Sequence, residues 1–266
     1  MASPSSIGHS ISTQARVSYA CGARLLGQKT RETPLGIFSA WVEPLATIFI
    51  MTLVFSSVRF RVPTLGDWLM IFLMTGILPI SVWRQSVVQG DSAVQRLRRV
   101  FVMPQVLPVD AMFAGVMTSL LVIWTLFLGI TFFFVLVYDM DWPQNLVFCF
   151  IPAFTNTMMA LGFAMINLVI KTWWRYWGVV FATVTGPIGI MSGMFYTIER
   201  MPKQVQDILY YNPLMHSTEL VRTYYFHDYT STFFDPMYYY GFSFGILLVG
   251  LMCERLFRYR ILHLKK

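Results

Sequence analysis

The stretch AMFAGVMTSLLVIWTLFLGITFFFVLVY, residues 111–138, decides the fold of this chain. None of its side chains is charged, and as a straight helix it would be about 42 Å long at 1.5 Å per residue. A helix needs about 20 mostly apolar residues to cross the hydrocarbon core of a membrane. Residues 111–138 therefore predict a membrane-spanning helix that either tilts or continues beyond the bilayer.

The composition of the whole chain points the same way. Of its 266 residues, 56% are hydrophobic and only 12% are charged, whereas a soluble domain carries about 25% charged residues. This balance excludes a soluble globular protein and an intrinsically disordered one. The chain has only 3 cysteines, two of them inside apolar runs, which excludes a disulfide-stabilised scaffold.

Six apolar stretches are candidates for membrane spans. They cover residues 38–58, 68–88, 109–138, 144–170, 176–198 and 236–253. The second has the shortest uncharged part, 16 residues between Asp67 and Arg84, and it spans only if Arg84 is buried in protein or extends to the interface. We therefore expect an all-α integral membrane protein, with residues 1–13 as a disordered tail and residues 14–266 as one transmembrane domain.

The lysines and arginines predict the orientation of this domain. If both termini are cytoplasmic, 15 of the 20 basic residues fall on the cytoplasmic side, as the positive-inside rule requires. The other five fall in outer loops and are Arg59, Arg61, Arg200, Lys203 and Arg222. The formal net charge of +7 is therefore mainly an orientation signal, and we expect no nucleic-acid partner.

Two segments on the predicted cytoplasmic side have helical patterns of their own. Residues 14–35 combine apolar and basic positions, which predicts an interfacial helix on the inner leaflet. The alternative is a basic tail that only sets the topology. Residues 90–101, with Asp91 or Ser92 as a cap and Pro104 as a stop, predict a short cytoplasmic helix that docks another protein. An ordinary basic loop is the alternative there.

The connection between the fifth and sixth spans, residues 199–235, is also patterned. The dipeptide Asn212-Pro213 separates two short apolar segments, which predicts two periplasmic re-entrant helices around a turn. Nine of the 13 tyrosines lie in residues 196–240. They favour an aromatic belt at the outer interface, with stacking platforms for sugar rings as the alternative.

The fifth span itself contains Gly186-Pro187 and the pair Gly189 and Gly193. Proline inside a helix removes a backbone hydrogen bond, so we expect a bend at residue 187. Two glycines four residues apart predict a smooth face for close helix contact. Both features concern packing and indicate no particular function.

No catalytic motif is present. The chain has no Gly-x-Ser-x-Gly, His-Glu-x-x-His or Cys-x-x-Cys pattern, and residues 22–30 miss the phosphate-binding loop by one inserted residue. His216, Glu219, His227 and Asp228 match no standard ligand spacing, so interfacial hydrogen bonds are favoured over a metal site.

Glu43 is the most costly residue in the chain, because it falls inside the first span. It lies near the predicted inner end of that span, where it can reach water or pair with an arginine. A structural ion pair with Arg31 or Arg84 is favoured over a role in transport.

Three stretches together resemble one family. Residues 34–44, PLGIFSAWVEP, resemble the segment that leads into the first span of ABC-2 type permeases, and residues 76–79, GILP, resemble an element of their second span. Residues 201–222, which end in NPLMHSTELVR, are similar to a signature of the capsular polysaccharide export branch. The resemblance extends over about residues 15–260.

The resemblance implies the permease subunit of an ATP-driven exporter that carries a lipid-linked, anionic polysaccharide across the bacterial inner membrane. It implies a homodimer that works with two separate ATPase subunits, a periplasmic adaptor and an outer-membrane channel. The chain would then be a transport subunit and not an enzyme. It would need no cofactor, because ATP and magnesium bind to the ATPase.

Two sets of candidate residues follow, and neither includes a metal ligand. Coupling to the ATPase is expected to use Gly90, Asp91, Gln95, Arg96, Arg98, Arg99 and Arg31. The polysaccharide path is expected to use Arg24, Trp41, Glu43, Arg84, Tyr196, Tyr210, Tyr211, His216, Glu219 and Arg222. The cytoplasmic arginines, which are Arg24, Arg31, Arg84, Arg96, Arg98 and Arg99, could attract the acidic glycan or its lipid phosphate, and the alternative role of each is to set the topology or to dock the ATPase.

Other functions stay open at this point. Exporters of O-antigen or teichoic acid share the six-span plan. A channel or secondary transporter would need no ATPase, but Glu43 has no ionisable counterpart in the second three spans. A membrane-embedded transferase would need a carboxylate or histidine cluster at one interface, which the scattered acidic residues do not supply.

Overall fold

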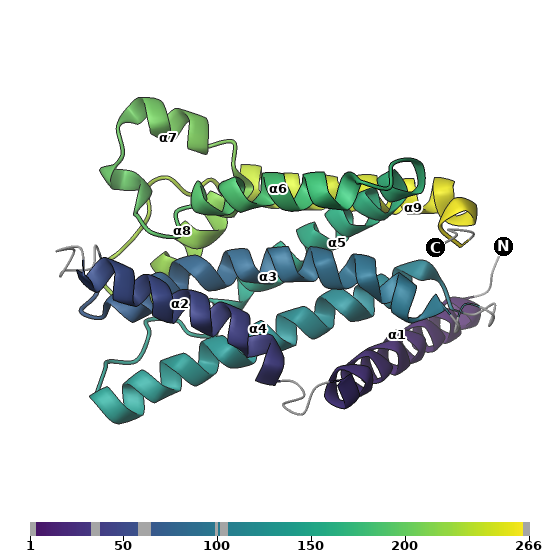
Figure 1. The fold of residues 1–266 in the computed structure, drawn as a ribbon, viewed down its shortest axis with the longest axis horizontal. Coiled ribbons are helices and arrows are strands. Elements are labelled where there is room, and N and C mark those ends of the chain that lie inside the picture. The colour runs from purple at the N-terminus through teal and green to yellow at the C-terminus, as the bar shows by residue number, and fades with distance from the viewer. Residues whose placement is uncertain (1–3, 33–37, 58–64, 99–100, 102–105, 263–266) are drawn as a thin grey trace.

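The computed structural model describes residues 4–32, 38–57, 65–98, 101 and 106–262 (Figure 1). Within these residues the chain is helical and has no strand, as expected for an all-α protein. The α-helices are α1 (Pro4–Glu32), α2 (Ser39–Ser57), α3 (Leu69–Arg96), α4 (Pro108–Tyr138), α5 (Phe150–Trp173), α6 (Trp177–Ile190), α7 (Lys203–Leu209), α8 (Pro213–Tyr225) and α9 (Pro236–Leu262).

The long helices form one elongated bundle. In the described part of the chain, α3, α4, α5 and α9 are long and apolar enough to cross a membrane, and α2 and α6 are shorter apolar helices. Helix α1 and the end of α9 lie at one end of the bundle, and α7 and α8 lie at the other (Figure 1). A multi-pass membrane protein is therefore confirmed, and the number of six spans stays a prediction.

Helix α3 is the centre of this bundle. Every residue from Ile71 to Trp83 is buried, and α3 packs against α2, α4, α5 and α8. A helix that is apolar on all sides is stable when other helices surround it. This explains how the stretch with the shortest uncharged part forms the core helix: protein covers it, and the helix continues past Arg84 to Arg96.

Helices α5 and α9 approach each other closely at two glycines. A Cβ atom added at Gly162 would lie 2.4 Å from the backbone oxygen of Ile246. A Cβ atom at Gly250 would lie 2.7 Å from the Cα atom of Gly162. Only glycine fits at this crossing, and small residues are the usual means by which helix backbones come into contact inside a membrane.

The predicted cytoplasmic helix at residues 90–101 is not a separate element. Residues 90–96 form the last two turns of α3, which continues without a break to Arg96. Gly90 makes this possible, because a Cβ atom there would lie 3.0 Å from both Ala164 and Val116. Packing against α5 and α4 therefore extends the helix through a residue that weakens helices in isolation.

Three further helix boundaries differ from the predicted ones. Helix α1 begins at Pro4, so residues 4–13 are helical and not a disordered tail. Helix α5 begins at Phe150, because residues 144–149 form turns. Helix α6 ends at Ile190, eight residues before the predicted end of the fifth span.

The early end of α6 also changes the role of its two glycines. Gly193 lies beyond the helix in a turn with φ +77, a conformation that favours glycine. A Cβ atom at residue 193 would also lie 2.9 Å from the Met215 sulfur. Gly189 and Gly193 therefore do not form a continuous helix face, and the predicted packing motif is wrong.

Helix α1 packs along α4 (Figure 1). Its buried side is formed by Cys21 and Leu25, which contact Ala93 and Leu97 at the end of α3. Tyr19, on the other side, is 80% exposed. These two faces agree with an amphipathic helix, and its position on the inner leaflet stays a prediction.

Candidate functional site

The predicted turn at Asn212-Pro213 joins α7 and α8, and the Asn212 side chain caps the start of α8. The Asn212 Oδ1 atom accepts a hydrogen bond from the Leu214 backbone nitrogen at 3.1 Å, and Pro213 occupies the first turn. The Asn212 Nδ2 atom also donates to Ser192 Oγ at 2.9 Å. One residue therefore starts α8 and ties it to the turn that follows α6.

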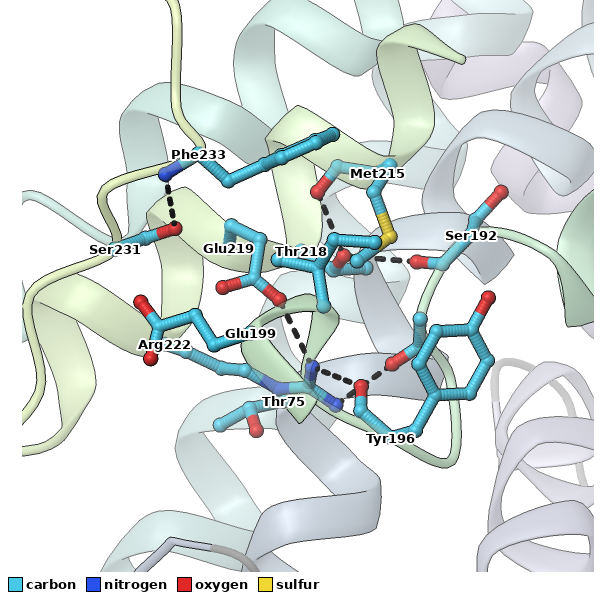
Figure 2. A network of polar contacts seen from close by, with 12 residues as sticks. Thr75, Ser192, Tyr196, Glu199, Met215, Thr218, Glu219, Arg222, Ser231 and Phe233 are labelled. Carbon is cyan, nitrogen blue, oxygen red and sulfur yellow. Dashed lines mark hydrogen bonds and ion pairs between the residues drawn. The ribbon is translucent and has the colours of Figure 1, made fainter. Parts of the chain in front are cut away.

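Arg222 forms the centre of a buried polar network on α8 (Figure 2). It is fully buried. Its Nη2 atom donates to the backbone oxygen of Gly193 at 2.7 Å, and its Nη1 atom donates to that of Tyr196 at 2.7 Å. Arg222 thereby holds residues 193–196 in place through their carbonyl groups. We call Ser192, Gly193, Tyr196, Thr218, Glu219, Arg222 and Tyr229 the α8 network.

Glu219 balances the charge of Arg222 inside the α8 network. The Nη1 atom of Arg222 lies 3.4 Å from Glu219 Oε1, and both side chains are fully buried. The Tyr229 hydroxyl donates to the other carboxylate oxygen. A buried charge is costly unless it is paired and hydrogen-bonded, so the pairing lowers the free-energy cost of burying each of the two charges.

The α8 network leaves no room for a larger residue where α3 passes beneath it. A Cβ atom at Gly76 would lie 2.4 Å from the Met194 backbone oxygen and 2.9 Å from Arg222 Nη2. The GILP element at residues 76–79 is thus explained at its first position: glycine lets the loop after α6 lie directly on α3. The last residue, Pro79, accepts a hydrogen bond through its carbonyl from Asn156 Nδ2 at 2.9 Å.

Asn156 is a second polar centre, on α5, that sequence analysis missed. Besides Pro79, its Nδ2 atom donates to Ser217 Oγ at 2.7 Å, and its Oδ1 atom accepts from the Tyr239 hydroxyl at 2.9 Å. It therefore links α3, α5, α8 and α9. The available signal was an amide side chain inside an apolar span, which is a common means of joining membrane helices.

His216 contacts the segments on either side of α8. Its Nε2 atom lies 2.8 Å from the Tyr210 backbone oxygen, and its Nδ1 atom accepts from the Asp235 backbone nitrogen at 3.3 Å. The Tyr210 hydroxyl donates to the Asp235 carboxylate. That hydrogen bond, together with those from the backbone of Tyr238 and Met237, lowers the pKa of Asp235.

Burial separates the predicted path residues of this region into two groups. His216, Glu219 and Arg222 are fully buried and bind other parts of the same chain. Tyr211 is 73% exposed, and Tyr196 and Tyr210 are half-buried. The signature at residues 212–222 therefore positions α8, and only the tyrosines have surface available to a ligand.

Helix α3 lines a polar cavity at the end of the bundle that holds α1. The cavity has a volume of about 600 Å³ and is formed by α2, α3, α5 and α6. Its polar lining residues are Glu43, Arg84, Gln85, Gln89, Asp91, Asn167, Lys171 and Thr185, and the apolar ones include Val87, Val88 and Phe181. We call it the polar cavity.

Two ion pairs lie in the polar cavity. Glu43 pairs with Arg84, one of its two predicted partners, and both side chains are about half exposed. Lys171 pairs with Asp91 Oδ2, and this pair is mostly buried. The partner of Asp91 lies 80 positions later in the chain, so no local spacing could have indicated it. Trp41, outside the cavity, donates to the Val122 backbone oxygen at 3.0 Å.

The predicted coupling residues fall at and beyond the end of α3. Gly90 and Asp91 are buried, whereas Gln95, Arg96 and Arg98 are exposed. Arg24 on α1 is exposed as well. Arg99 and the Arg31 side chain lie outside the described residues. The exposed residues Gln95, Arg96 and Arg98 therefore lie at the end of α3, and the buried residues Gly90 and Asp91 precede them in the chain.

No group of three or more His, Cys, Asp or Glu side chains in the described part of the chain could hold a metal ion. The three cysteines are free thiols, with Cys21 and Cys149 buried.

Comparison with known proteins shows which proteins this chain is similar to. The family model described as "ABC-2 type transporter" matches residues 17–226. The chain is 24% identical over 243 residues to the capsule polysaccharide export inner-membrane protein CtrC of Neisseria meningitidis serogroup A, which covers 91% of each chain. It is 26% identical over 252 residues to the capsule polysaccharide export inner-membrane protein BexB of Haemophilus influenzae, with 93% of each chain covered.

Proposed function

The chain belongs to the ABC-2 type transporter family, and on that premise we propose that it is the permease subunit of an ATP-driven exporter of capsular polysaccharide. Its cargo is a lipid-linked, anionic glycan, which it carries outward across the inner membrane. The observation that carries this proposal is the match, over more than nine tenths of each chain, to CtrC and BexB, both of which are named as capsule polysaccharide export inner-membrane proteins.

A separate ATPase supplies the energy in this proposal. This chain is a transport subunit, and its nearest approach to a phosphate-binding loop, residues 22–30, carries one residue too many. The exposed Gln95, Arg96 and Arg98 at the end of α3 offer a polar, basic surface for such a partner. Leu97, fully buried beside them against α1, fixes that end of the helix.

Two copies of the chain form the transport path in this proposal. Helices α2 and α6 present large apolar side chains outward, among them Phe49 (57% exposed) and Val179 (68% exposed). Either lipid or a second copy can cover such surfaces. With both termini cytoplasmic, α7 and α8 lie at the periplasmic end, where a periplasmic adaptor leading to an outer-membrane channel would meet the permease.

Deletion of the gene tests the function directly. We expect polysaccharide to accumulate inside the deletion strain and to disappear from its surface, and a plasmid copy to restore export. Immunoblots of intact and lysed cells with antibody to the capsule distinguish the two locations. Capsule at the parental level on the surface of the deletion strain would contradict the proposal.

A further inference from the structure

The polar cavity lies next to a group of exposed aromatic side chains. Its residues include Lys171, in the last turn of α5, and Gly178, at the start of α6. The end of α5 and the turn that follows it carry Trp173, Trp174 and Tyr176, which are 54%, 48% and 69% exposed. Exposed tryptophan and tyrosine side chains of this kind mark the interface between the hydrocarbon core and the head groups.

The two cations of the polar cavity have donors to spare. An arginine has five N–H donors and a lysine has three. Among the described residues, Arg84 donates only to Glu43, and Lys171 donates only to Asp91. Gly178 provides the space for Lys171, because a Cβ atom there would lie 3.3 Å from Lys171 Cε. Both cations therefore reach the cavity with hydrogen-bonding capacity unused.

The two carboxylates differ in how easily they can leave their cations. Glu43 has a side chain that is 60% exposed, and an exposed ion pair is worth only about 0–1 kcal/mol. Asp91 has a side chain that is only 11% exposed, and it is fixed on α3, beside Lys171 of α5. Rotation of Glu43 toward solvent would leave two cations and one carboxylate, so the cavity would gain one net positive charge.

One carboxylate oxygen of Asp91 also lacks a hydrogen-bond donor. Its Oδ1 atom is buried and has no hydrogen-bond partner among the described residues. A buried acceptor without a partner costs free energy, so the cavity is not fully satisfied by the chain alone. A hydroxyl group next to a bound phosphate would be a suitable donor, and Gln85, Gln89 and Asn167 add amide groups around it.

We propose that the polar cavity is a binding site for the phosphate head group of an anionic lipid, with Arg84 and Lys171 as the phosphate ligands. Glu43 occupies Arg84 when no lipid is bound and is displaced by the phosphate. The guanidinium binds phosphate oxygens in a fork, and the ammonium binds as a point charge. Val87, Val88 and Phe181 give the lipid an apolar wall. The inference rests on the proposed function, for which it names the site that receives the lipid end of the cargo.

Lipid binding to the full chain in a neutral detergent tests the proposal, with lysophosphatidylglycerol as the probe and native mass spectrometry as the readout. Arg84→Gln and Lys171→Gln should each weaken binding about tenfold, the loss expected for about 1.4 kcal/mol. Glu43→Gln should tighten binding about threefold or more, because it removes the competing carboxylate. Arg175→Gln, in the same turn but outside the cavity, is the matched control and should bind as the parent does.

The sign of the Glu43→Gln effect separates binding from structure. If the pair with Arg84 only stabilised the fold, Glu43→Gln and Arg84→Gln would act alike and neither would change lipid binding, and that result would overturn the proposal. Inorganic phosphate and lysophosphatidylcholine distinguish the ligand chemistry. If inorganic phosphate binds as tightly as lysophosphatidylglycerol, the ligand is free phosphate and the lipid proposal is overturned. If lysophosphatidylcholine binds as tightly, the site does not select for the negative charge of the head group, and the proposal is overturned as well.

Export in cells separates this inference from the proposed function. If capsule still depends on the gene but the Arg84 and Lys171 variants bind lysophosphatidylglycerol normally, the inference fails and the function stands. If lipid binding follows the pattern above but deletion of the gene leaves capsule on the surface, the function fails and the site stands as a lipid site.

Discussion

The guanidinium carbon of Arg222 lies 4.5 Å from the ring centroid of Phe72. This cation–π contact joins α8 to α3, in addition to the hydrogen bonds that Arg222 makes to residues 193 and 196. A cation that stacks on a ring inside a protein is held more strongly than one at the surface. Arg222 therefore connects three segments of the chain: α8, the loop after α6, and the central helix.

Replacement of Arg222 should destabilise the protein more than it alters any ligand contact. Arg222→Met removes two hydrogen bonds to backbone carbonyls and leaves Glu219 buried without its cation, which typically costs about 3–5 kcal/mol. We expect a lower melting temperature in detergent and less protein in the membrane. Arg200→Met, at an exposed position of the same connection, is the control.

The double variant Arg222→Met/Glu219→Gln should be more stable than Arg222→Met alone, because it removes the orphaned charge. Thermal unfolding of the parent, both single variants and the double variant gives the coupling energy. If Arg222→Met melted like the parent but abolished export, Arg222 would act on the cargo and not on the fold.

Gly76 offers a test of the contact between the loop after α6 and α3. Gly76→Ala places a methyl group 2.4 Å from the Met194 oxygen, so backbone must move, and we expect both lower stability and reduced export. Gly129→Ala on α4 has open space around the new methyl group and should be neutral or up to about 1 kcal/mol more stable. Equal melting temperatures for the two variants would contradict the tight contact.

The basic end of α3 is expected to bind the ATPase. Arg96→Glu combined with Arg98→Glu reverses two exposed charges and should reduce the amount of ATPase that co-purifies with the permease. The same reversal at Arg200 and Lys203, at the opposite end of the bundle, should leave co-purification unchanged. An unchanged complex in the first variant would place the docking surface elsewhere.

The orientation can be measured with single cysteines. Gln204→Cys on α7 should react with a membrane-impermeant maleimide in cells whose outer membrane has been made permeable. Gln95→Cys should react only after the inner membrane is opened. The parent chain is the control for its own thiols, of which Cys21 and Cys149 are buried. The reverse order of labelling would invert the predicted topology.

Apolar length and turn chemistry carried most of the fold prediction. Residues 109–138 are predicted as a span and form α4 (Pro108–Tyr138), because the uncharged run 111–138 within them has few alternatives. The Asn212-Pro213 turn was found for a local reason, since both residues act within the first turn of α8. Helix ends set by tertiary packing were missed, such as the continuation of α3 through Gly90.

The candidate site was harder to predict than the fold. The burial of Glu219 and Arg222 could not be predicted, because sequence alone does not tell an exposed amphipathic helix from a buried one. Their place on the path of the cargo stays a prediction. Lys171 and Asn156 were missed for a different reason. Their partners are distant in sequence, and a single polar residue in a span gives no indication of which helix it will meet.

Because α3 is one unbroken helix, the directions in which residues at its two ends face are fixed relative to each other. Gly76 must face the loop after α6, and Gly90, fourteen residues further, must face α4 and α5. Each residue turns an α-helix by about 100°. One residue inserted between them would therefore rotate one end away from its neighbours while the other stayed in place. The number of residues in this helix is consequently under as tight a constraint as their identity, and a deletion there should harm the protein more than a substitution.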